Sequence, residues 1–523
     1  MSWLRTNLLA GLSSLIALLA AIPLIYVFYG SIKLPTERWL GLWSTRLPEL
    51  LWNTLSLAVL VGATTLIIGI SAAWLIVRRR FPARSIALWL MILPLTIPTY
   101  VFAYIYTNLL ENDGWLGQAW HTLFGITSQI PDIYSTGGVM LILAMSTFPY
   151  VFLLVHSALS QANPHLEEAA RIHGANSATI FWQVTRPLLR PAIAAGLALV
   201  TLHVLSDFGA VSMLRYQTFT LSIYLQMSGR FDYNAAAGLS LVLILLAMVF
   251  LILERFFRKR QRYYASGHSR QRPARQASPA ECLLIWGWLG LIALFAFFLP
   301  LAWMVSWSAR AIAMNTIDLA FWGYALNSVV LALLAATLAI IIALPVGLFH
   351  HRNRNLFSLS LLQSSSIGFV LPGPVIALGV LTFILAQLPI LYGGIAALII
   401  ALIIRFLPLA VQSQESSLQQ LTPSIEQAGR VLGANALQNL WHITLPMMRK
   451  GMITAWVLVF IDALKELPAT LILRPIGFDT LPVRIWIEAS EEMLEHSAPA
   501  ALMLMLATLP ALWIMMRDRT NSA

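Results

Sequence analysis

The chain has 523 residues, of which 59% are hydrophobic and only 11% are charged, and its formal net charge is +11. Soluble domains carry about 25% charged residues, so this composition excludes an ordinary soluble protein and indicates a polytopic membrane protein. Nucleic-acid binding is not expected, because the basic residues lie in loops between apolar segments. The single cysteine, Cys282, excludes an intrachain disulfide.

Twelve apolar segments are long enough to cross a bilayer as helices, which takes about 20 residues each. The first lies near the N-terminus and is interpreted as a retained helix, because no removable signal peptide is evident. The predicted spans are 7–29, 53–77, 85–109, 137–160, 192–214, 236–256, 281–307, 327–349, 365–388, 391–412, 451–473 and 498–516.

The distribution of basic residues predicts the orientation. If both termini are cytoplasmic, the cytoplasmic segments hold 23 of the 33 Lys and Arg residues, and the opposite loops hold 8. The sequence therefore predicts a multi-pass membrane protein with both termini in the cytoplasm. The outer loops are acidic by comparison, with Glu488, Glu491, Glu492 and Glu495 before the last span. These acids either keep the loop soluble or form a docking surface for a soluble partner.

The two halves of the chain are related. Residues 164–190 and 423–449 align at an offset of 259 without a gap, and 11 of the 27 positions are identical. Asn53 and Asn327 correspond at an offset of 274. Because each half has six predicted spans, both repeats have the same orientation. We expect an all-α polytopic membrane protein with about 12 transmembrane helices in two parallel six-helix bundles, and a substrate path between them.

The repeats define three segments along the chain. The first repeat covers residues 1–256, a basic cytoplasmic linker covers 257–280, and the second repeat covers 281–523. The linker is rich in Ser, Gln, Pro and Gly and is predicted to be a flexible connection. Its basic residues could bind anionic headgroups, but a signal that retains the loop in the cytoplasm is the simpler interpretation.

The repeated polar segment is predicted to form two short helices outside the membrane. Asn163 and Thr422 are suitable N-cap residues. In each copy a proline opens the first helix, a glycine ends it, and a second proline closes the second helix. These residues are Pro164, Gly174 and Pro187 in the first copy, and Pro423, Gly433 and Pro446 in the second. An amphipathic interfacial hairpin would explain one copy, whereas its repetition favours docking into a groove of another protein.

The pattern Glu-Ala-Ala, three residues, Gly, nine residues, Ile-x-Leu-Pro resembles the EAA loop of ABC importer permeases. The first EAA loop is 164–187, with Arg186 in place of the leucine, and the second is 423–446, with Gln427 in place of the motif glutamate. The resemblance assigns ATPase coupling to Glu167, Glu168, Ala169, Ala170, Arg171, Gly174, Pro187, Glu426, Gln427, Ala428, Gly429, Arg430, Gly433 and Pro446.

Within that superfamily, residues 206–220 and 464–475 resemble the fused iron(III) permeases, although thiamine and aminoethylphosphonate permeases share the fused layout. The resemblance implies a location in a bacterial inner (plasma) membrane. It also implies a periplasmic substrate-binding protein, two cytoplasmic ATPase subunits and membrane lipid as partners. It also implies a permease that is not an enzyme and binds no cofactor of its own, while its partner subunits use ATP. In agreement, the sequence has no G-x-x-x-x-G-K-[ST] phosphate loop.

Ionisable side chains inside predicted spans are candidates for a substrate path or gate. They are His203, Asp207, Asp462, Lys465 and Glu466. Asp207 and Glu466 are repeat equivalents whose oxygen donors suit iron(III), so they are also the candidate metal ligands. Alternatively, Lys465 neutralises one of the acids in a structural pair, or the group forms a gate or a contact with the binding protein. Arg405 is predicted to be a counter-ion for one of these acids, or to snorkel to an interface.

Prolines in the third and ninth predicted spans, at Pro94, Pro98, Pro372 and Pro374, are expected to kink these helices.

Two other classes of membrane protein fit the sequence less well than an importer permease does. An ion-gradient-driven secondary transporter would leave the repeated cytoplasmic hairpin unexplained. A membrane-embedded enzyme would need a catalytic constellation, and the sequence shows neither a metal-ligand pattern nor a nucleophile elbow.

Overall fold

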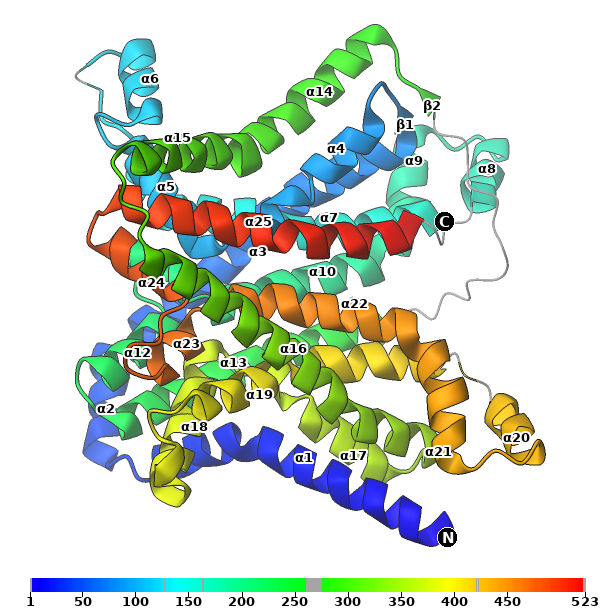
Figure 1. The fold of residues 1–523 in the computed structure, drawn as a ribbon. Coiled ribbons are helices and arrows are strands. Elements are labelled where there is room, and N and C mark those ends of the chain that lie inside the picture. The colour runs from blue at the N-terminus through cyan, green and yellow to red at the C-terminus, as the bar shows by residue number, and fades with distance from the viewer. Residues whose placement is uncertain are drawn as a thin grey trace. The chain divides into compact units, whose positions relative to one another are not determined.

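The computed structural model describes residues 2–126, 128–161, 164–259, 275–419, 421 and 423–520. These residues are almost entirely helical and form two compact units (Figure 1). The first-repeat unit consists of Leu40–Leu221 and Val242–Ala309. The second-repeat unit consists of Met1–Trp39, Ser222–Leu241 and Arg310–Ala523.

The first-repeat unit holds most of the elements up to residue 309. In chain order they are α3 (Leu47–Arg78), β1 (Arg79–Arg80), α4 (Arg84–Leu90), η1 (Leu93–Thr96), α5 (Thr99–Leu110), α6 (Trp115–Phe124), α7 (Thr136–Gln161), α8 (Pro164–Ile172), α9 (Ser177–Ile180), η2 (Phe181–Thr185), α10 (Arg186–Ser206), α11 (Gly209–Met213), β2 (Arg275–Gln276), α14 (Pro279–Ala293), η3 (Leu294–Phe298) and α15 (Leu299–Ala313). The long helix α13 (Tyr233–Lys259) passes from the second-repeat unit into this one.

The second-repeat unit begins with the N-terminal helix of the chain. Its elements are α1 (Ser2–Ile32), α16 (Leu319–Arg352), α17 (Leu356–Ser365), η4 (Ile367–Phe369), α18 (Gly373–Gln387), η5 (Pro389–Leu391), α19 (Ile395–Gln419), α20 (Pro423–Val431), α21 (Ala436–Asn439), η6 (Leu440–Thr444), α22 (Leu445–Leu464), α23 (Pro468–Leu473), α24 (Leu481–Ser490) and α25 (Leu494–Thr520). Two further helices, α2 (Thr36–Thr45) and α12 (Phe219–Ser228), have residues in both units.

Both units are built around the same three-helix core. Helices α3, α7 and α10 pack against one another in the first-repeat unit, and their repeat equivalents α16, α19 and α22 do so in the second. Small buried residues line these contacts, such as Ala72 and Ala73 in α3 and Ala335 and Ala336 in α16. Small side chains let helix backbones approach closely, which supplies the packing energy that the bilayer does not.

The first helix of each repeat packs in the unit of the other repeat. Helix α1 contacts α16, α17 and α18, and Tyr26 meets the ring of Phe383 edge-on with centroids 5.6 Å apart. Conversely, α14 and α15 belong to the first-repeat unit, where Trp303 Nε1 donates to Asn108 Oδ1 at 2.8 Å. The packing units therefore exchange one membrane helix relative to the repeats in the sequence.

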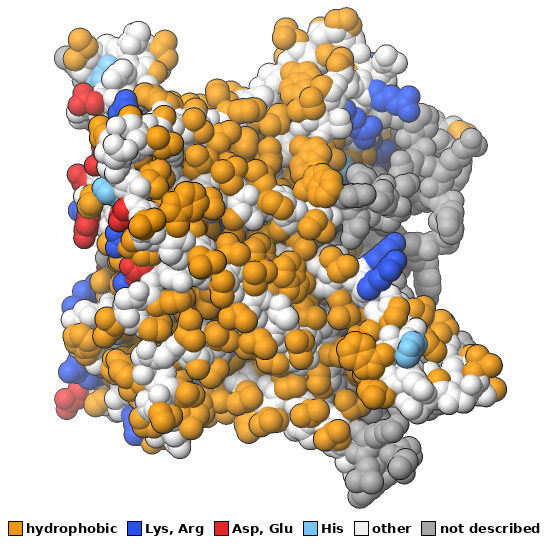
Figure 2. Space-filling view, in the orientation of Figure 1, with side chains coloured by type: hydrophobic (Ala, Val, Ile, Leu, Met, Phe, Trp, Pro, Cys, Tyr) orange, Lys and Arg blue, Asp and Glu red, His pale blue; other side chains and the backbone are white. Residues whose placement is uncertain are grey.

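Long apolar helices confirm a multi-pass membrane protein. Among the described residues, nine helices are long and apolar enough to cross a membrane, and a bent pair of helices makes up to ten. In Figure 2 hydrophobic side chains cover most of the visible helix surfaces, and charged side chains gather near helix ends. The N-terminal candidate, Asn7–Ile32, agrees with the predicted first span.

Four predicted spans are not continuous helices. The third is broken at Pro98, where the two parts meet at an angle of 96°. The ninth is divided between α17 and α18, and the expected kinks are thus full breaks. The fifth and eleventh spans end early, at Ser206 and Leu464, and each continues in a short helix, α11 or α23. A proline has no N–H to donate, which explains the breaks before α5 and α18, at Pro98 and Pro372. The cause of the breaks in the fifth and eleventh spans lies in buried carboxylates described below.

The predicted flexible linker is ordered where it re-enters the membrane domain. Residues 275–276 form β2, which pairs in parallel with β1, and Ala277 N–H donates to the Arg80 carbonyl at 3.0 Å. A capping box between Ser278 and Glu281 then starts α14. Residues 260–274 lie outside the described part of the chain.

Candidate functional site

Both EAA loops begin with a short amphipathic helix that ends at a left-handed glycine. Helix α8 ends before Gly174, with a φ of 80°, and α20 ends before Gly433, with a φ of 88°. The next N–H groups, of Ala175 and Ala434, each bond back five residues at 3.0 Å. These are the hydrogen bonds of a helix C-cap, so the predicted glycine breaks are confirmed. The predicted N-caps, Asn163 and Thr422, lie outside the described residues.

The prediction that Pro187 and Pro446 close a second short helix is wrong. In each loop a helical turn, α9 or α21, passes through a five-residue π-helical segment into a membrane helix. Each proline occupies one of the first two positions of that helix, α10 or α22. The first turn of a helix tolerates proline, and a π-helical turn absorbs the altered hydrogen bonding before it. Each EAA loop is therefore continuous with a membrane span.

A buried glutamate ties the first EAA loop to the membrane helices. Glu167 is only 5% exposed and forms an ion pair with Arg78, the last residue of α3. It also accepts a hydrogen bond from Thr185 Oγ1 at 3.0 Å. A buried carboxylate needs such partners. Sequence reasoning placed Glu167 in the loop but missed Arg78, although its offset of 274 to Arg352 was a signal.

The second EAA loop relies on close packing at a glycine. A Cβ atom added to Gly429 would lie 2.2 Å from Oδ1 of the buried Asn439 and 2.7 Å from Cδ1 of Ile443. The first loop has Ala170 and Ile180 at the positions of Gly429 and Asn439. The second loop thus departs from Glu-Ala-Ala at Gly429, the position where α20 packs against Asn439 of α21.

The remaining motif residues lie mainly on the surface of the loops. Exposed positions are Ala169, Arg171, Gln427, Ala428 and Pro446, and partly buried ones are Ala170 and Pro187. The side chains of Glu168, Glu426 and Arg430 lie outside the described part of the structure. The exposed motif positions thus combine small residues with the polar side chains of Arg171 and Gln427.

Apolar side chains project from the tip of each loop. Ile172 is 85% exposed in the first loop, and its repeat equivalent Val431 is 87% exposed in the second, next to the equally exposed Leu432. Trp182 in η2 and Trp441 in η6 are also exposed. Exposed apolar residues clustered on a polar loop are typical of a surface that contacts a protein or a membrane. The sequence repeat did not indicate which residues form the tip.

Asp207 and Glu466 are buried helix caps at the breaks in the fifth and eleventh spans. Asp207 Oδ1 accepts the N–H groups of Ala210 and Val211 at 3.0 and 3.2 Å, and Thr99 Oγ1 donates to its other oxygen. Glu466 Oε1 accepts the N–H of Ala469 at 3.2 Å. These bonds satisfy the first N–H groups of α11 and α23, which explains why the chain breaks there.

The two repeats hold these equivalent acids with different partners. Arg405 Nε lies 2.8 Å from Glu466 Oε2, so the prediction that Arg405 is a counter-ion is confirmed. The position of Arg405 in the first repeat is Ser146, and the hydroxyl of Thr99 holds the acid there instead. Both carboxylates are thus occupied by contacts within their own units.

The other path candidates lie one helical turn earlier and are more accessible. His203 is exposed, and its Nε2 lies 3.4 Å from the hydroxyl of Tyr150. Asp462, the repeat equivalent of His203, is half-buried beside Lys465, with Nζ 3.9 Å from Oδ1. Within the described part of the chain, no three His, Cys, Asp or Glu side chains are placed to hold a metal ion.

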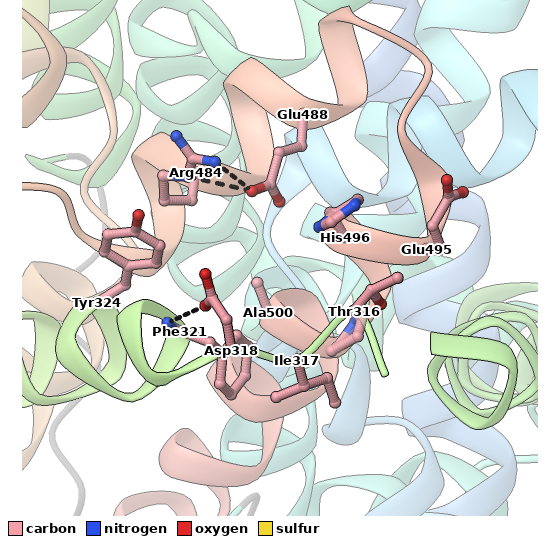
Figure 3. Close-up of a pocket in the computed structure, with 11 residues that line it drawn as sticks. Thr316, Ile317, Asp318, Phe321, Tyr324, Arg484, Glu488, Glu495, His496 and Ala500 are labelled. Carbon is pink, nitrogen blue, oxygen red and sulfur yellow. Dashed lines mark hydrogen bonds and ion pairs between the residues drawn. The ribbon is translucent and has the colours of Figure 1, made fainter. Parts of the chain in front are cut away.

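A small pocket lies in the second-repeat unit among the acids before the last span (Figure 3). Its volume is about 60 Å³, and the side chains of Asp318, Arg484, Glu488 and His496 surround it. Glu488 turns inward onto Arg484 at 2.8 Å, and burial raises the pKa of its carboxyl although Arg484 acts in the opposite direction. Glu488 is therefore not part of an open acidic surface, unlike the exposed pair Glu491 and Glu492.

Comparison with known proteins adds three findings. The chain matches the family "Binding-protein-dependent transport system inner membrane component" twice, over residues 65–263 and 335–517. It is 31% identical over 497 residues to the Fe(3+)-transport system permease protein FbpB 2 of Haemophilus influenzae, covering 94% of both chains. It is 25% identical to the ferric transport system permease protein FbpB of Actinobacillus pleuropneumoniae, covering 80% of this chain and 64% of that one.

A shorter relative matches one part of the chain. The sulfate transport system permease protein CysW of a Synechocystis strain is 31% identical over 249 residues, which are 46% of this chain and 88% of that protein. A fused two-repeat chain and a single-repeat chain are thus both similar to this sequence.

Proposed function

The chain belongs to the family of binding-protein-dependent transport system inner membrane components, and we propose that it is the permease of an ABC importer for iron(III). The observation that supports iron(III) as the substrate is the similarity along 94% of both chains to an Fe(3+)-transport permease. The chain is a transport component and not an enzyme. A permease for thiamine or a phosphonate is the second candidate, because the fused layout is not specific to iron.

In the proposed mechanism, two ATPase subunits bind the EAA loops at 164–187 and 423–446 on the cytoplasmic side. Closure of the ATPase dimer on ATP would push on both loops as rigid bodies. The uninterrupted passage from η2 into α10 and from η6 into α22 supports this transmission. ATP is used by the partner subunits, and no cofactor of the permease takes part.

The substrate arrives with a periplasmic binding protein that docks on the opposite side. His203 and Asp462 are the preferred path residues, because both are accessible, whereas Asp207 and Glu466 are engaged as helix caps. Hard oxygen donors suit iron(III), and neutral imidazole also binds iron. Directed transport requires that affinity for iron differ between the outward-facing and inward-facing states.

Uptake of radiolabelled iron(III) by iron-limited cells tests the proposal. Cells that lack the gene should lose uptake, and so should Gly174→Val and Gly433→Val, because a β-branched residue cannot adopt the left-handed φ without strain. Gly477→Val is the matched control, since its φ is 78° and its Cβ would meet open space outside the EAA loops. Unchanged iron uptake in the deletion, with no redundant system present, would contradict iron(III) as the substrate. Uptake of thiamine and of a phosphonate would then be measured.

Co-purification separates the importer from an ion-gradient-driven secondary transporter. The importer should retain a soluble ATPase when it is extracted from the membrane, and both glycine variants should weaken that association. A chain that transports iron without any associated ATPase, and that responds only to the ion gradient, would contradict the mechanism.

A further inference from the structure

The loop between α3 and α4 is held in place by the end of the linker. Its strand β1 (Arg79–Arg80) pairs with β2, and Ala277 N–H donates to the Arg80 carbonyl at 3.0 Å. Trp286 Nε1 donates to the Pro82 carbonyl at 3.2 Å, and the same indole meets the Phe81 ring edge-on at 5.9 Å. Four arginines, Arg79, Arg80, Arg84 and Arg275, are thus carried on an ordered scaffold within the first-repeat unit.

The arginines divide between the two faces of this ribbon. Arg275 forms an ion pair with Glu281 at 3.7 Å, and Arg79 acts electrostatically on the same carboxylate. Arg80 is exposed, and Arg84, four residues later at the start of α4, is half-buried. Successive strand residues point to opposite faces, which explains why Arg79 and Arg80 have different neighbours.

Arg80 and Arg84 have no ion-pair partner among the residues that the structure describes. The neighbouring linker segment 260–274 cannot supply one, because its sequence contains no Asp or Glu. Two adjacent cations without an acid are unfavourable unless an anion neutralises both. Guanidinium groups bind phosphate oxygens in a fork geometry, so a phosphate group is the anion that fits best.

The pair lies where three candidate membrane spans begin or end. Leu47–Arg78 ends just before it, Arg84 opens the bent pair of helices, and Pro279–Ala313 starts beside β2. Ile86 in α4 and Leu283 and Leu284 in α14 expose 56%, 75% and 73% of their surfaces on the helices that follow β1 and β2. Figure 2 shows basic side chains where Figure 1 places β1 and β2, bordered by hydrophobic surface along α14.

We propose that Arg80 and Arg84 bind the phosphate of an anionic phospholipid, whose acyl chains lie against the exposed apolar residues of α4 and α14. Apolar surface directly beside the cations distinguishes a lipid from free phosphate. The second repeat does not share the site, because Arg84 is replaced there by Ser358, which bonds to Asn353, Asn355 and His350. The bound lipid braces the chain segment that follows Arg78, the partner of Glu167 in the first EAA loop.

The test uses the full chain with its associated ATPase, in nanodiscs of phosphatidylcholine alone or of equal parts phosphatidylcholine and phosphatidylglycerol. Native mass spectrometry counts the phosphatidylglycerol retained, and thermal unfolding reports its effect on stability. Arg80→Gln with Arg84→Gln should lower lipid affinity by about fivefold per arginine and abolish the stabilisation by phosphatidylglycerol. Arg354→Gln, the equivalent of Arg80 in the second repeat, should leave both unchanged.

Three results would overturn the proposal. The double variant could retain phosphatidylglycerol as the unmodified chain does. Glycerol phosphate in detergent could stabilise the protein as much as the lipid does, which would assign the site to a free anion. The variant could lose its ATPase while keeping its lipid, which would assign the arginines to the protein partner. Arg84→Gln alone provides a milder variant if the double substitution does not accumulate in the membrane.

Discussion

At the scale of single residues, the two repeats stabilise the same helix break with different chemistry. Glu466 is paired with Arg405 at 2.8 Å, whereas Asp207 is held by Thr99 and two backbone N–H groups. An ion pair buried in a membrane protein tolerates the loss of one partner poorly, because the remaining charge is then desolvated and unpaired. A carboxylate held by neutral donors loses less when one donor is removed.

Replacement of Arg405 by Gln is therefore expected to destabilise the protein by about 3–5 kcal/mol, and Thr99→Val by about 1.5–3 kcal/mol. Thermal unfolding of the purified chain in detergent measures both changes. Arg405→Gln combined with Glu466→Gln should recover most of the loss, because it removes the unpaired charge. Equal effects of the two single variants would contradict the assigned difference between the repeats.

Gly429 is a second position where one atom decides the local structure. A Cβ there would lie 2.2 Å from the Asn439 Oδ1 atom, so Gly429→Ala should cost about 1–3 kcal/mol and loosen α20 from α21. Limited proteolysis of the second EAA loop measures this change. Ala170→Gly at the equivalent position of the first loop is the comparison. This change creates no clash, so it should not make the first loop more sensitive to protease through a clash. Identical protease sensitivity of Gly429→Ala and the unmodified chain would count against the close packing.

At the scale of structural elements, a buried ion pair between Glu167 and Arg78 connects the first EAA loop to α3. Glu167→Gln would remove the carboxylate charge that pairs with Arg78 at the end of α3. We expect iron uptake to fall several-fold while the amount of protein in the membrane stays the same. Glu37→Gln, on the exposed face of α2, is the control for loss of a negative charge. Normal uptake by Glu167→Gln would show that α8 is held by other contacts.

The tips of the EAA loops are predicted to be the centres of ATPase binding. Ile172→Asp or Val431→Asp would place a charge in a contact that is proposed to be apolar, at a cost of about 2 kcal/mol or more, or roughly 30-fold in affinity. Co-purification of the ATPase measures the loss. Ile390→Asp in η5, where the native side chain is 90% exposed, is the control. If only one tip variant loses the ATPase, the two loops contribute unequally.

At the scale of the whole molecule, the exchange of first helices makes each packing unit depend on both repeats. A chain ending at Gly267 lacks α14, which packs on α3, and α15, whose Trp303 bonds to Asn108 of α5, and a chain starting at His268 lacks α1. Either fragment alone should accumulate several-fold less than the intact protein, whereas co-expression should restore membrane levels. Quantitative blots of membrane fractions measure this.

A longer fragment serves as the control for that prediction. Residues 1–315 retain α14 and α15, so this fragment should accumulate better than residues 1–267, although it carries more exposed apolar chain. Equal levels of the two fragments would show that α14 and α15 contribute little to the stability of the first-repeat unit.

The amino-acid sequence by itself determined the class of protein, the repeat, the position of both EAA loops and the breaks at Gly174 and Gly433. These features follow from local properties: apolar length, proline and glycine conformation, and a spacing that recurs at a fixed offset. Pro98 was also a local signal, so a kink in the third span was predicted, although not the full break at 96°.

Only the tertiary structure decided which polar residues serve stability and which remain accessible. Asp207 and His203 look alike in sequence, as intramembrane ionisable residues four positions apart, yet one caps a helix and the other is exposed. The burial of Asp207 depends on partners such as Thr99, which is more than 100 residues away in sequence, and no local pattern predicts such partners. The exchange of α1 and the pairing of the linker with β1 likewise depend on long-range packing, because a helix or strand of suitable composition fits several neighbours and the whole fold selects one.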